Sequence, residues 1–422
     1  MSTIFALATP PGRGAIAILR LSGPATDAAL AALGAPGLRP RVASLRTLTH
    51  EGRRIDEALV LRFPGPSSYT GEDCAELHLH GGRAVVETVG EALVALGLRP
   101  AEPGEFTRRA FANGRIDLAE AEGLADLLAA ETEFQRRAAI ELAGGALSRR
   151  VEGWRGRLLA LSARLEAALD FEDEADVGQL PASFVHEINE LSSELGEALR
   201  APAAERLREG YRVALAGPPN AGKSTLFNAL VENEAAITAP LAGTTRDVLE
   251  RPVALAGIPF TFVDMAGLRE AGADPVEAIG IARAEAEIAR ADLVLWLGAE
   301  GEGPAGAWEI EPRCDRPDRI AKAAPRYRVS ARTGEALAAL KHGLIAEATG
   351  AMPKPGEGAL NRRQRDLLAQ AQAALEAAQH EGDPLLLAEA LRQARLAFDR
   401  LTGRSATEDV LDALFGRFCI GK

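Results

Sequence analysis

The pattern of apolar and polar residues changes character twice along this chain. Up to residue 117, short runs alternate between apolar and polar positions, which is the period of a strand with one buried face. The runs that predict strands are residues 3–8, 15–21, 57–62 and 74–80. A helix is predicted at residues 83–97. The first 117 residues are therefore predicted to form an α+β domain.

Helical spacing replaces this alternation from Asp117 onward. Residues 117–206 are rich in Ala, Leu, Glu and Arg, and their apolar residues recur at helical intervals. The same composition returns at residues 357–401. Residues 405–408 (SATE) predict a capping-box start for a last helix that ends near Phe415.

A region with short, almost wholly apolar runs separates the two helical stretches. Strands are predicted at residues 211–216, 260–263, 291–297, 307–311 and 327–330, and a helix at 224–232. Because domain termini often lie close together, the simplest organisation is an α/β domain inserted into one discontinuous helical domain. The expected fold is multidomain, α/β plus all-α, with boundaries at 1–117, 118–206, 207–351 and 352–422.

Composition narrows the class of protein. With 422 residues the chain is too long for a single core. It has no apolar run long enough to span a membrane, its first residues do not form a signal peptide, and its three cysteines are too widely spaced for a disulfide framework or zinc site. These features predict a cytosolic protein. A net charge of −12 argues against binding nucleic acid by charge alone.

The most specific motif lies at residues 217–225 (GPPNAGKST), which match the phosphate-binding loop G-x-x-x-x-G-K-[ST] between a strand and a helix. The glycines let backbone N–H groups turn toward phosphate oxygens, the lysine reaches the terminal phosphates, and the serine hydroxyl helps to hold Mg²⁺. The residues assigned to this site are Asn220, Ala221, Gly222, Lys223, Ser224 and Thr225.

Two further segments fit a Ras-like nucleotide domain. Residues 243–247 (GTTRD) form a predicted loop in which Thr245 ligates Mg²⁺ and senses the terminal phosphate. The strand at 260–263 leads into a D-x-x-G segment. There Asp264 contacts Mg²⁺ through water, and the N–H of Gly267 meets the terminal phosphate.

Guanine recognition is altered in this sequence. Ser330, Ala331 and Arg332 resemble the S-A-[KR] loop that lies over a guanine ring, but no N-K-x-D motif is present. Asp315 and Asp318 are both candidates for the base-reading carboxylate. We favour Asp315, because it follows a predicted strand at the carboxyl end, where α/β sites lie.

Two departures from the pattern of a Ras-like nucleotide domain bear on catalysis. Only nine residues, 298–306, separate two predicted parallel strands, fewer than the about 10–12 that a crossover with its helix needs. We therefore predict that this crossover helix is missing. Leu268 stands where Ras-like enzymes use a glutamine to orient water, so another group must do so.

One polar group in the first domain admits two interpretations. Glu76, His78 and His80 share one face of a predicted strand. A metal site is one interpretation, and the polar face of a sheet is the one we favour, because only two histidines and one carboxylate converge.

Several segments together resemble the MnmE (TrmE) family of tRNA-modification GTPases over nearly the full length. They are residues 9–14 (TPPGRG), 18–23 (ILRLSG), 68–73 (SYTGED), 103–107 (PGEFT) and the final FCIGK at 418–422. The resemblance implies a homodimer that works with the flavoprotein MnmG, in a heterotetramer or larger complex, to modify C5 of the tRNA wobble uridine. A tetrahydrofolate derivative, 5-formyl or 5,10-methylene, is implied as the one-carbon source.

The resemblance also assigns residues. It places Arg20, Glu76, Arg115 and Lys422 at the folate site; the family has Lys at the position of Arg115. It implies a K⁺ site formed by Asn220 and the loop residues Ala239, Leu241 and Thr244, with Thr in the family at the position of Ala239. It makes Glu277 the catalytic residue that positions water and Cys419 a reactive residue in the modification step.

Two other functions stay open at this point. A regulatory or ribosome-assembly GTPase uses the same nucleotide domain as a timer, but it needs neither the C-terminal Cys419 nor a folate-like first domain. A folate-binding scaffold with a degenerate nucleotide domain is favoured by the altered base motif and the short crossover.

Overall fold

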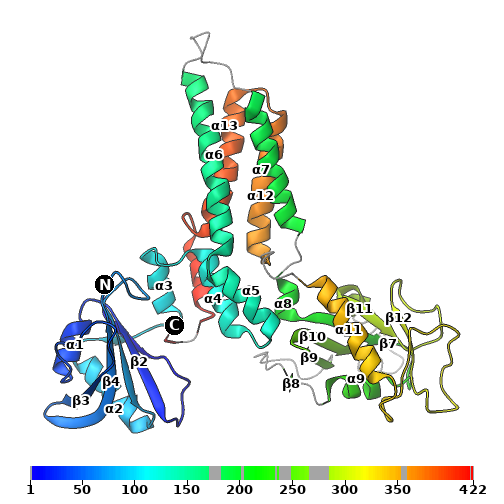
Figure 1. The fold of residues 1–422 in the computed structure, drawn as a ribbon, viewed down its shortest axis with the longest axis horizontal. Helices are drawn as coiled ribbons and strands as arrows, with labels where there is room; N and C mark the ends of the chain where they lie inside the picture. Colours follow the sequence, from blue (N-terminus) through cyan, green and yellow to red (C-terminus); the bar gives the residue numbers. More distant parts are fainter. Residues whose placement is uncertain are drawn as a thin grey trace, which may run out of the picture. The chain divides into compact units, whose positions relative to one another are not determined.

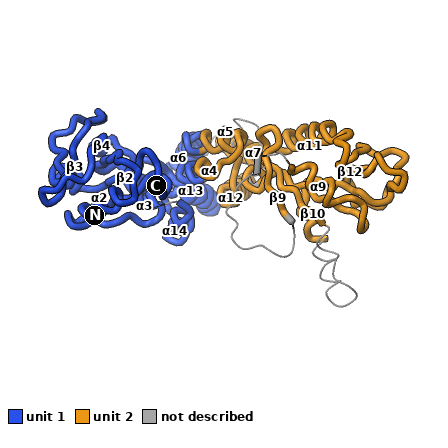
Figure 2. Tube along the Cα trace, turned by 90° about the horizontal axis from the view of Figure 1, so that it is seen from below, with its two compact units in different colours: residues 1–125, 143–179, 383–422 blue, residues 126–142, 180–382 orange. Residues whose placement is uncertain are grey.

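A computed structural model describes residues 2–170, 182–200, 204–232, 235–236, 249–265, 285–352, 359–418 and 420–421. The chain divides into two compact units (Figure 2). The first unit contains residues 1–125, 143–179 and 383–422, and the second contains 126–142 and 180–382. No helix in the described part of the chain is long and apolar enough to cross a membrane.

The first unit begins with a six-stranded sheet in the order β3-β4-β5-β2-β1-β6. Its strands are β1 (Ile4–Leu7), β2 (Ile16–Ser22), β3 (Ser44–His50), β4 (Arg53–Phe63), β5 (Cys74–His80) and β6 (Arg99–Pro100). All neighbours are antiparallel except β1 and β6. The four predicted strands are present, and the sequence pattern missed β3 and β6.

One face of this sheet is the core of the first domain. Helices α1 (Thr26–Ala32) and α2 (Arg83–Ala95) lie against the sheet (Figure 1). The strands contribute mainly leucines, valines and alanines to the core that they share with these helices. The other face retains exposed aliphatic residues, with Leu45 58% and Leu59 45% exposed. These two leucines are paired across β3 and β4.

The remaining helices of the first unit come from both helical stretches of the sequence. They are α3 (Glu105–Ala112), most of α4 (Leu118–Ala129), α6 (Ala146–Asp170), α13 (Pro384–Thr402) and α14 (Glu408–Phe415). Helices α6 and α13 pack together through stacked rings of Trp154 and Phe398, whose centroids are 6.2 Å apart. A stretch from before the inserted domain thus packs with one from after it, as a discontinuous helical domain requires.

The second unit holds a seven-stranded sheet in the order β13-β12-β11-β7-β10-β9-β8. Its strands are β7 (Tyr211–Ala216), β8 (Ala235–Ala236), β9 (Leu249–Leu255), β10 (Ile258–Asp264), β11 (Leu293–Trp296), β12 (Trp308–Glu311) and β13 (Tyr327–Arg328). The strands from β13 to β10 are parallel, and β9 and β8 are antiparallel additions. Helices α9 (Lys223–Val231) and α11 (Leu337–Ala351) contribute to the core on one face.

The helices α5 (Glu133–Ala143), α7 (Ala182–Arg200), α8 (Glu205–Glu209) and α12 (Arg362–His380) complete the second unit. Helices α7 and α12 pack as a pair, and Arg365 of α12 donates to the carbonyl of Leu199 at 2.6 Å. The capping box that the sequence predicts before α14 is not formed, because α14 begins only at Glu408 and Thr407 makes no side-chain cap bond. A capping box does start α12, between Asn361 and Gln364.

The predicted loss of a crossover helix is confirmed. All residues between β11 and β12 are described, and they form turns and bends without a helix. The fully described connection between β12 and β13, residues 312–326, also lacks a helix, which the sequence pattern did not predict.

Candidate nucleotide and folate sites

The phosphate-loop motif lies at the carboxyl end of β7, where the chain turns into α9. Gly222 precedes the helix with φ +97°, and Asn220 has φ +61°. The ammonium group of Lys223 donates to the carbonyls of Gly217 and Pro218, at 2.9 and 2.8 Å. The lysine therefore folds back over its own loop, which is the position from which it can reach bound phosphates.

Asp264 ends the strand next to β7. It is paired in register with Leu215 and is buried. Because β7 and β10 are parallel, their carboxyl ends carry the phosphate loop and this carboxylate to the same edge of the sheet. Ser224 is exposed in the first turn of α9 at that edge.

A cavity of about 220 Å³ opens beside the phosphate loop. Three segments line it: the loop and the start of α9, the segment after β12, and the segment after β13. The lining residues are Gly222, Thr225, Leu226, Pro312, Arg313, Asp315, Arg316, Val329, Ser330, Ala331 and Arg332.

Asp315 is held in this cavity by two partners. Ser330 donates to its Oδ1 atom at 2.6 Å, and Arg332 donates to Oδ2 from Nε at 3.0 Å. The hydrogen bond from Ser330 is the main cause of a lowered pKa of Asp315, with Arg332 contributing, so the carboxylate is ionised at neutral pH. Asp318 is exposed and is not among the lining residues.

Two features of the structure bear on the glycine at position 222. Its φ of +97° is unfavourable for a side chain, and a Cβ there would lie 3.3 Å from Nε of Arg313. Arg313 thus covers the phosphate loop with its side chain and links it to the segment that carries Asp315.

A second polar group lies in the first unit around Arg20 of β2. Its guanidinium donates from Nε and Nη2 to Oε1 of Glu76 on β5, at 3.1 and 2.9 Å. The other carboxylate oxygen of Glu76 lies 3.3 Å from Nε2 of His78. The rings of Tyr69 and Phe106 flank the guanidinium, with centroids 5.7 and 6.0 Å from Cζ.

Gly421 contacts the polar group around Arg20. The carbonyl of Gly421 accepts from Nη1 of Arg20 at 3.4 Å. Gly421 has φ +101°, and a Cβ would collide with the carbonyl of Leu7. A glycine is therefore needed for the chain to pass β1 here.

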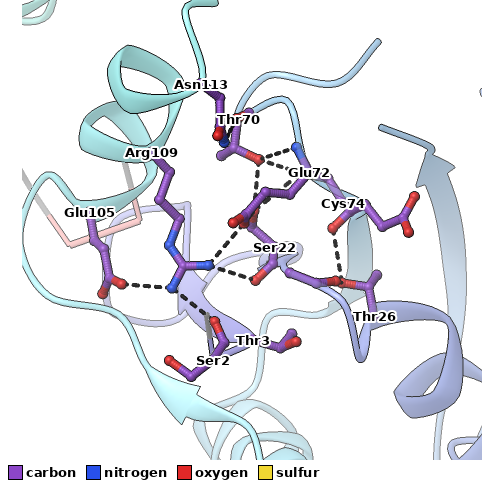
Figure 3. Close-up of polar contacts among 12 residues, drawn as sticks. Ser2, Thr3, Ser22, Thr26, Thr70, Glu72, Cys74, Glu105, Arg109 and Asn113 are labelled. Carbon is purple, nitrogen blue, oxygen red and sulfur yellow. Dashed lines mark hydrogen bonds and ion pairs between the residues drawn. The ribbon is translucent and has the colours of Figure 1, made fainter. Parts of the chain in front are cut away.

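The loop that carries Tyr69, residues 68–73, is anchored by buried polar contacts (Figure 3). Arg109 of α3 donates to Glu72 and to Glu105, each at 2.9 Å. Ser22 at the end of β2 donates to the same oxygen of Glu72 at 2.6 Å. These contacts fix the loop between the sheet and α3.

Comparison with known proteins decides the family. Residues 3–115 match the family model "GTP-binding protein TrmE N-terminus", and residues 118–419 match "MnmE helical domain". Proteins named tRNA modification GTPase MnmE from Erythrobacter litoralis and Novosphingobium aromaticivorans are each 58% identical to this chain. The first match covers all of both chains, and the second covers all of this chain and 99% of the other. The chain belongs to the MnmE family of tRNA modification GTPases.

Membership of the MnmE family makes this chain a GTP hydrolase of tRNA modification. Solved structures match more remotely. The G domain of the FeoB iron transporter of T. maritima is 26% identical and covers 32% of this chain and 98% of its own, with a TM-score of 0.23. Era of Aquifex aeolicus is 21% identical and covers 41% and 69%, with a TM-score of 0.25.

The assigned site residues of this MnmE-family chain fall into three groups. The structure brings together Arg20 with Glu76, and Asp315 with Ser330 and Arg332. Arg115 is exposed and lies against Gly71 in the same loop as Tyr69. Outside the described residues lie Ala239, Leu241, Thr244, Thr245, Gly267, Glu277, Cys419 and Lys422.

Two features of the MnmE-family site were not found from the sequence. Tyr69 and Phe106 enclose Arg20, and Arg109 anchors the loop of Tyr69. The only signal was that both aromatic residues lie in segments that carry the family resemblance. His78 and His80 contact different carboxylates: His78 lies 3.3 Å from Glu76, and His80 lies 2.7 Å from Asp56. Among the described residues, no three or more His, Cys, Asp or Glu side chains form a group that could hold a metal ion.

Proposed function

We propose that this chain couples GTP hydrolysis in its second unit to modification of C5 of the tRNA wobble uridine, using a tetrahydrofolate derivative as one-carbon source. The proposed binding of GTP rests on one observation: a single cavity is lined by Gly222 of the phosphate loop and by Asp315 and Ser330. The Asp315 carboxylate supplies acceptors for the N–H groups of a guanine, and the phosphate loop supplies donors for its phosphates.

Magnesium fits the oxygen-rich edge beside the phosphate loop. Ser224 and Asp264 offer the hydroxyl and carboxylate oxygens that Mg²⁺ prefers, and Thr245 completes the proposed set. When bound, the ion supplies positive charge to the phosphate oxygens. Lys223 adds a second positive charge from its place over the loop.

Potassium is proposed to supply the charge that an arginine finger provides in other GTPases. Asn220 would hold it with Ala239, Leu241 and Thr244. The amide of Asn220 starts from a backbone with φ +61°, which asparagine tolerates better than most residues. Glu277 is proposed to position water, since Leu268 cannot.

The folate derivative is proposed to bind at Arg20 and Glu76, with Arg115 and Lys422. A carboxylate accepts hydrogen bonds from pterin N–H groups, and arginine and lysine pair with the carboxylates of the glutamate tail. Glu76 is half-buried and already accepts from Arg20, so it is held ready as an acceptor. At this site the carbonyl of Gly421, two residues after the proposed reactive Cys419 in the sequence, accepts from Arg20.

A homodimer and the flavoprotein MnmG are the proposed protein partners. The open face of the first sheet supports a second copy of this chain, because Leu45 and Leu59 form an exposed aliphatic pair and Ile16 is 57% exposed. MnmG would supply the redox chemistry that none of the residues assigned here provides.

The alternative of a folate-binding scaffold with a degenerate nucleotide domain is favoured by one observation: Asp315 is paired with Arg332 within the chain. Hydrolysis and affinity for GTP and ATP, each measured in K⁺ and in Na⁺, separate the two functions. We expect hydrolysis selective for GTP that is lost in Na⁺. Binding without selectivity and without a K⁺ effect would favour the scaffold.

The proposed role in modification of the tRNA wobble uridine needs a test in the cell. A deletion strain should lose the modified wobble uridine without a defect in ribosome assembly, measured by nucleoside analysis of bulk tRNA and by ribosome profiles. Unchanged tRNA with defective ribosomes would instead favour a ribosome-assembly GTPase.

A further inference from the structure

Strands β11, β12 and β13 are joined in turn by two connections without helices. Residues 297–307 connect β11 to β12, and residues 312–326 connect β12 to β13; both connections are fully described and neither contains a helix. The second connection begins with the segment that carries Asp315, and the two residues of β13 follow it and lead into Val329 and Ser330. Its placement therefore determines the shape of the cavity that receives the base.

The side chains of β12 show how the sheet is covered there. Trp308 and Ile310 belong to the apolar core. Glu309 and Glu311 alternate with them and so point to the opposite face, where a crossover helix would normally place apolar residues. Glu311 is nonetheless only 2% exposed.

Three donors from the connection and from β13 converge on Glu311. Arg319 donates from Nε to Oε1 at 2.8 Å. The backbone N–H of Lys322 and Nε of Arg328 donate to Oε2, at 3.1 and 3.2 Å. Glu311 thus ties the returning half of the connection to β13, directly ahead of the Ser330 loop.

Lys322 joins this group to the other connection. Its side chain is fully buried, and its ammonium group pairs with Glu309 and donates to the carbonyl of Trp296 at 2.8 Å. Glu309 also accepts from the N–H of Gly301 at 3.1 Å. From the shorter connection, Glu300 accepts from the N–H of Ala324 at 2.9 Å.

These contacts replace apolar packing with directional bonds. A buried carboxylate is tolerated only when its acceptors are satisfied, and three donors satisfy those of Glu311. The geometry of the connection is therefore set by Glu311 to a degree that an apolar contact would not impose.

We propose that Glu311 is a positioning residue for guanine recognition: by holding residues 312–326 and Arg328, it places Asp315 and Ser330 against Gly222. Glu311 is not among the residues that line the cavity, so in this proposal it acts through Asp315. This inference rests on the proposed binding of GTP to the cavity. In this proposal the hydrogen bonds of Glu311, rather than a crossover helix, hold the residues that select guanine.

The test compares Glu311→Gln with Asp292→Asn in the full chain. Asp292 is a matched control, because it also accepts from a backbone N–H, that of Arg212 at 2.9 Å, and pairs with an arginine, Arg206 at 3.2 Å. It precedes the amino end of β11, whereas the nucleotide cavity lies at the carboxyl ends of the strands. For each variant we would measure kcat, KM for GTP, the preference for GTP over ITP and the melting temperature.

We expect Glu311→Gln to raise KM for GTP about tenfold or more, to reduce the preference for GTP over ITP, and to leave kcat within about twofold of the wild type. Asp292→Asn should lower the melting temperature without a change in KM or preference. Glu311→Gln with wild-type KM and preference, or with a loss confined to kcat, overturns the proposal.

Arg319 provides a second variant if Glu311→Gln does not fold. Arg319 is partly exposed, so Arg319→Gln removes one donor with little risk to folding. A rise in KM of about threefold in Arg319→Gln that Arg319→Lys restores supports the proposal, and an unchanged KM overturns it. A wild type that does not prefer GTP would instead refute the proposed function itself.

Discussion

At the scale of single residues, the nucleotide cavity depends on how one carboxylate is oriented. Asp315 has a buried partner, Ser330, and an exposed one, Arg332, whose side chain is 72% exposed. Exposed ion pairs contribute little, whereas a hydrogen bond from a buried donor to a charged group contributes more. Removal of Ser330 should therefore weaken GTP binding more than removal of Arg332.

We expect Ser330→Ala to weaken GTP binding about tenfold, because Asp315 loses its buried donor and the N–H of Thr333 loses its acceptor. The matched change Arg332→Ala should alter affinity by less than about threefold. Titration with a fluorescent GTP analogue measures both. Equal losses in the two variants would contradict this ranking.

The folate proposal makes a prediction at Glu76. Glu76→Gln keeps the shape of the side chain but removes the charge that pairs with Arg20, so binding of 5-formyltetrahydrofolate should weaken about tenfold or more. Arg62→Gln is a control, since Arg62 pairs with Asp27 on the same domain. Calorimetric titration with 5-formyltetrahydrofolate measures the affinity of each protein. If Glu76→Gln and the wild type bind it with similar affinity, the folate binds elsewhere.

At the scale of elements, α3 is held to the first sheet by Glu105 in its first turn. Burial raises the pKa of Glu105, but hydrogen bonds from Arg99, the N–H of Glu102 and Arg109 outweigh it and lower the pKa from 4.5 to about 2. The lowered pKa means that the ionised form is bound more tightly in the folded state than in the unfolded chain.

The stability contributed by Glu105 is therefore present above its ordinary pKa of 4.5 and is lost as the pH falls from 4.5 toward about 2. Glu105→Gln should lower the melting temperature near neutral pH and flatten its decline over that interval. Thermal unfolding followed by circular dichroism measures both. Parallel curves for the two proteins would show that Glu105 contributes no pH dependence.

Much of the element pattern could be predicted from the sequence because it depends on local periods. Residues 211–216 coincide with β7, and the short run before residue 307 could not contain a helix. The second helix-free connection could not be predicted, because residues 312–326 are long enough for a helix. What excludes one is the convergence of Arg319, Lys322 and Arg328 on Glu311, and this convergence exists only once β12 and β13 are paired.

The candidate site was predictable to a similar extent. A phosphate loop has a fixed spacing, so its residues can be identified from the sequence. The sequence favoured Asp315 over Asp318 by its place after a predicted strand, but the contact between Asp315 and Ser330 could be seen only in the structure. Tyr69 and Phe106 were missed because their common contact, Arg20, is far from both along the chain.

At the scale of the whole molecule, the open sheet face of the first unit is the surface we propose for association of two copies. Leu45 of β3 and Leu59 of β4 are adjacent on it. Aliphatic residues at such a pair have a strong tendency to become buried on association.

Leu59→Asp should convert a dimer to monomers, because a charge would be buried at the interface. Val94→Asp is the control, since Val94 is similarly exposed but lies on α2, which packs on the other face of the sheet. Sedimentation velocity of the full chain measures both. An unchanged mass for Leu59→Asp would exclude this face as the interface.

The closure of the β12 face by carboxylates has a consequence for protein engineering. Designers of α/β proteins normally assign a helix to every parallel crossover, so that each face of the sheet is covered. Here two connections without helices close the face, because Glu309 and Glu311 collect backbone and cationic donors from the loops. A nucleotide-binding scaffold can thus be shortened by replacing crossover helices with loops, provided that alternate positions of the strand between the two loops become acceptors for the donors those loops supply.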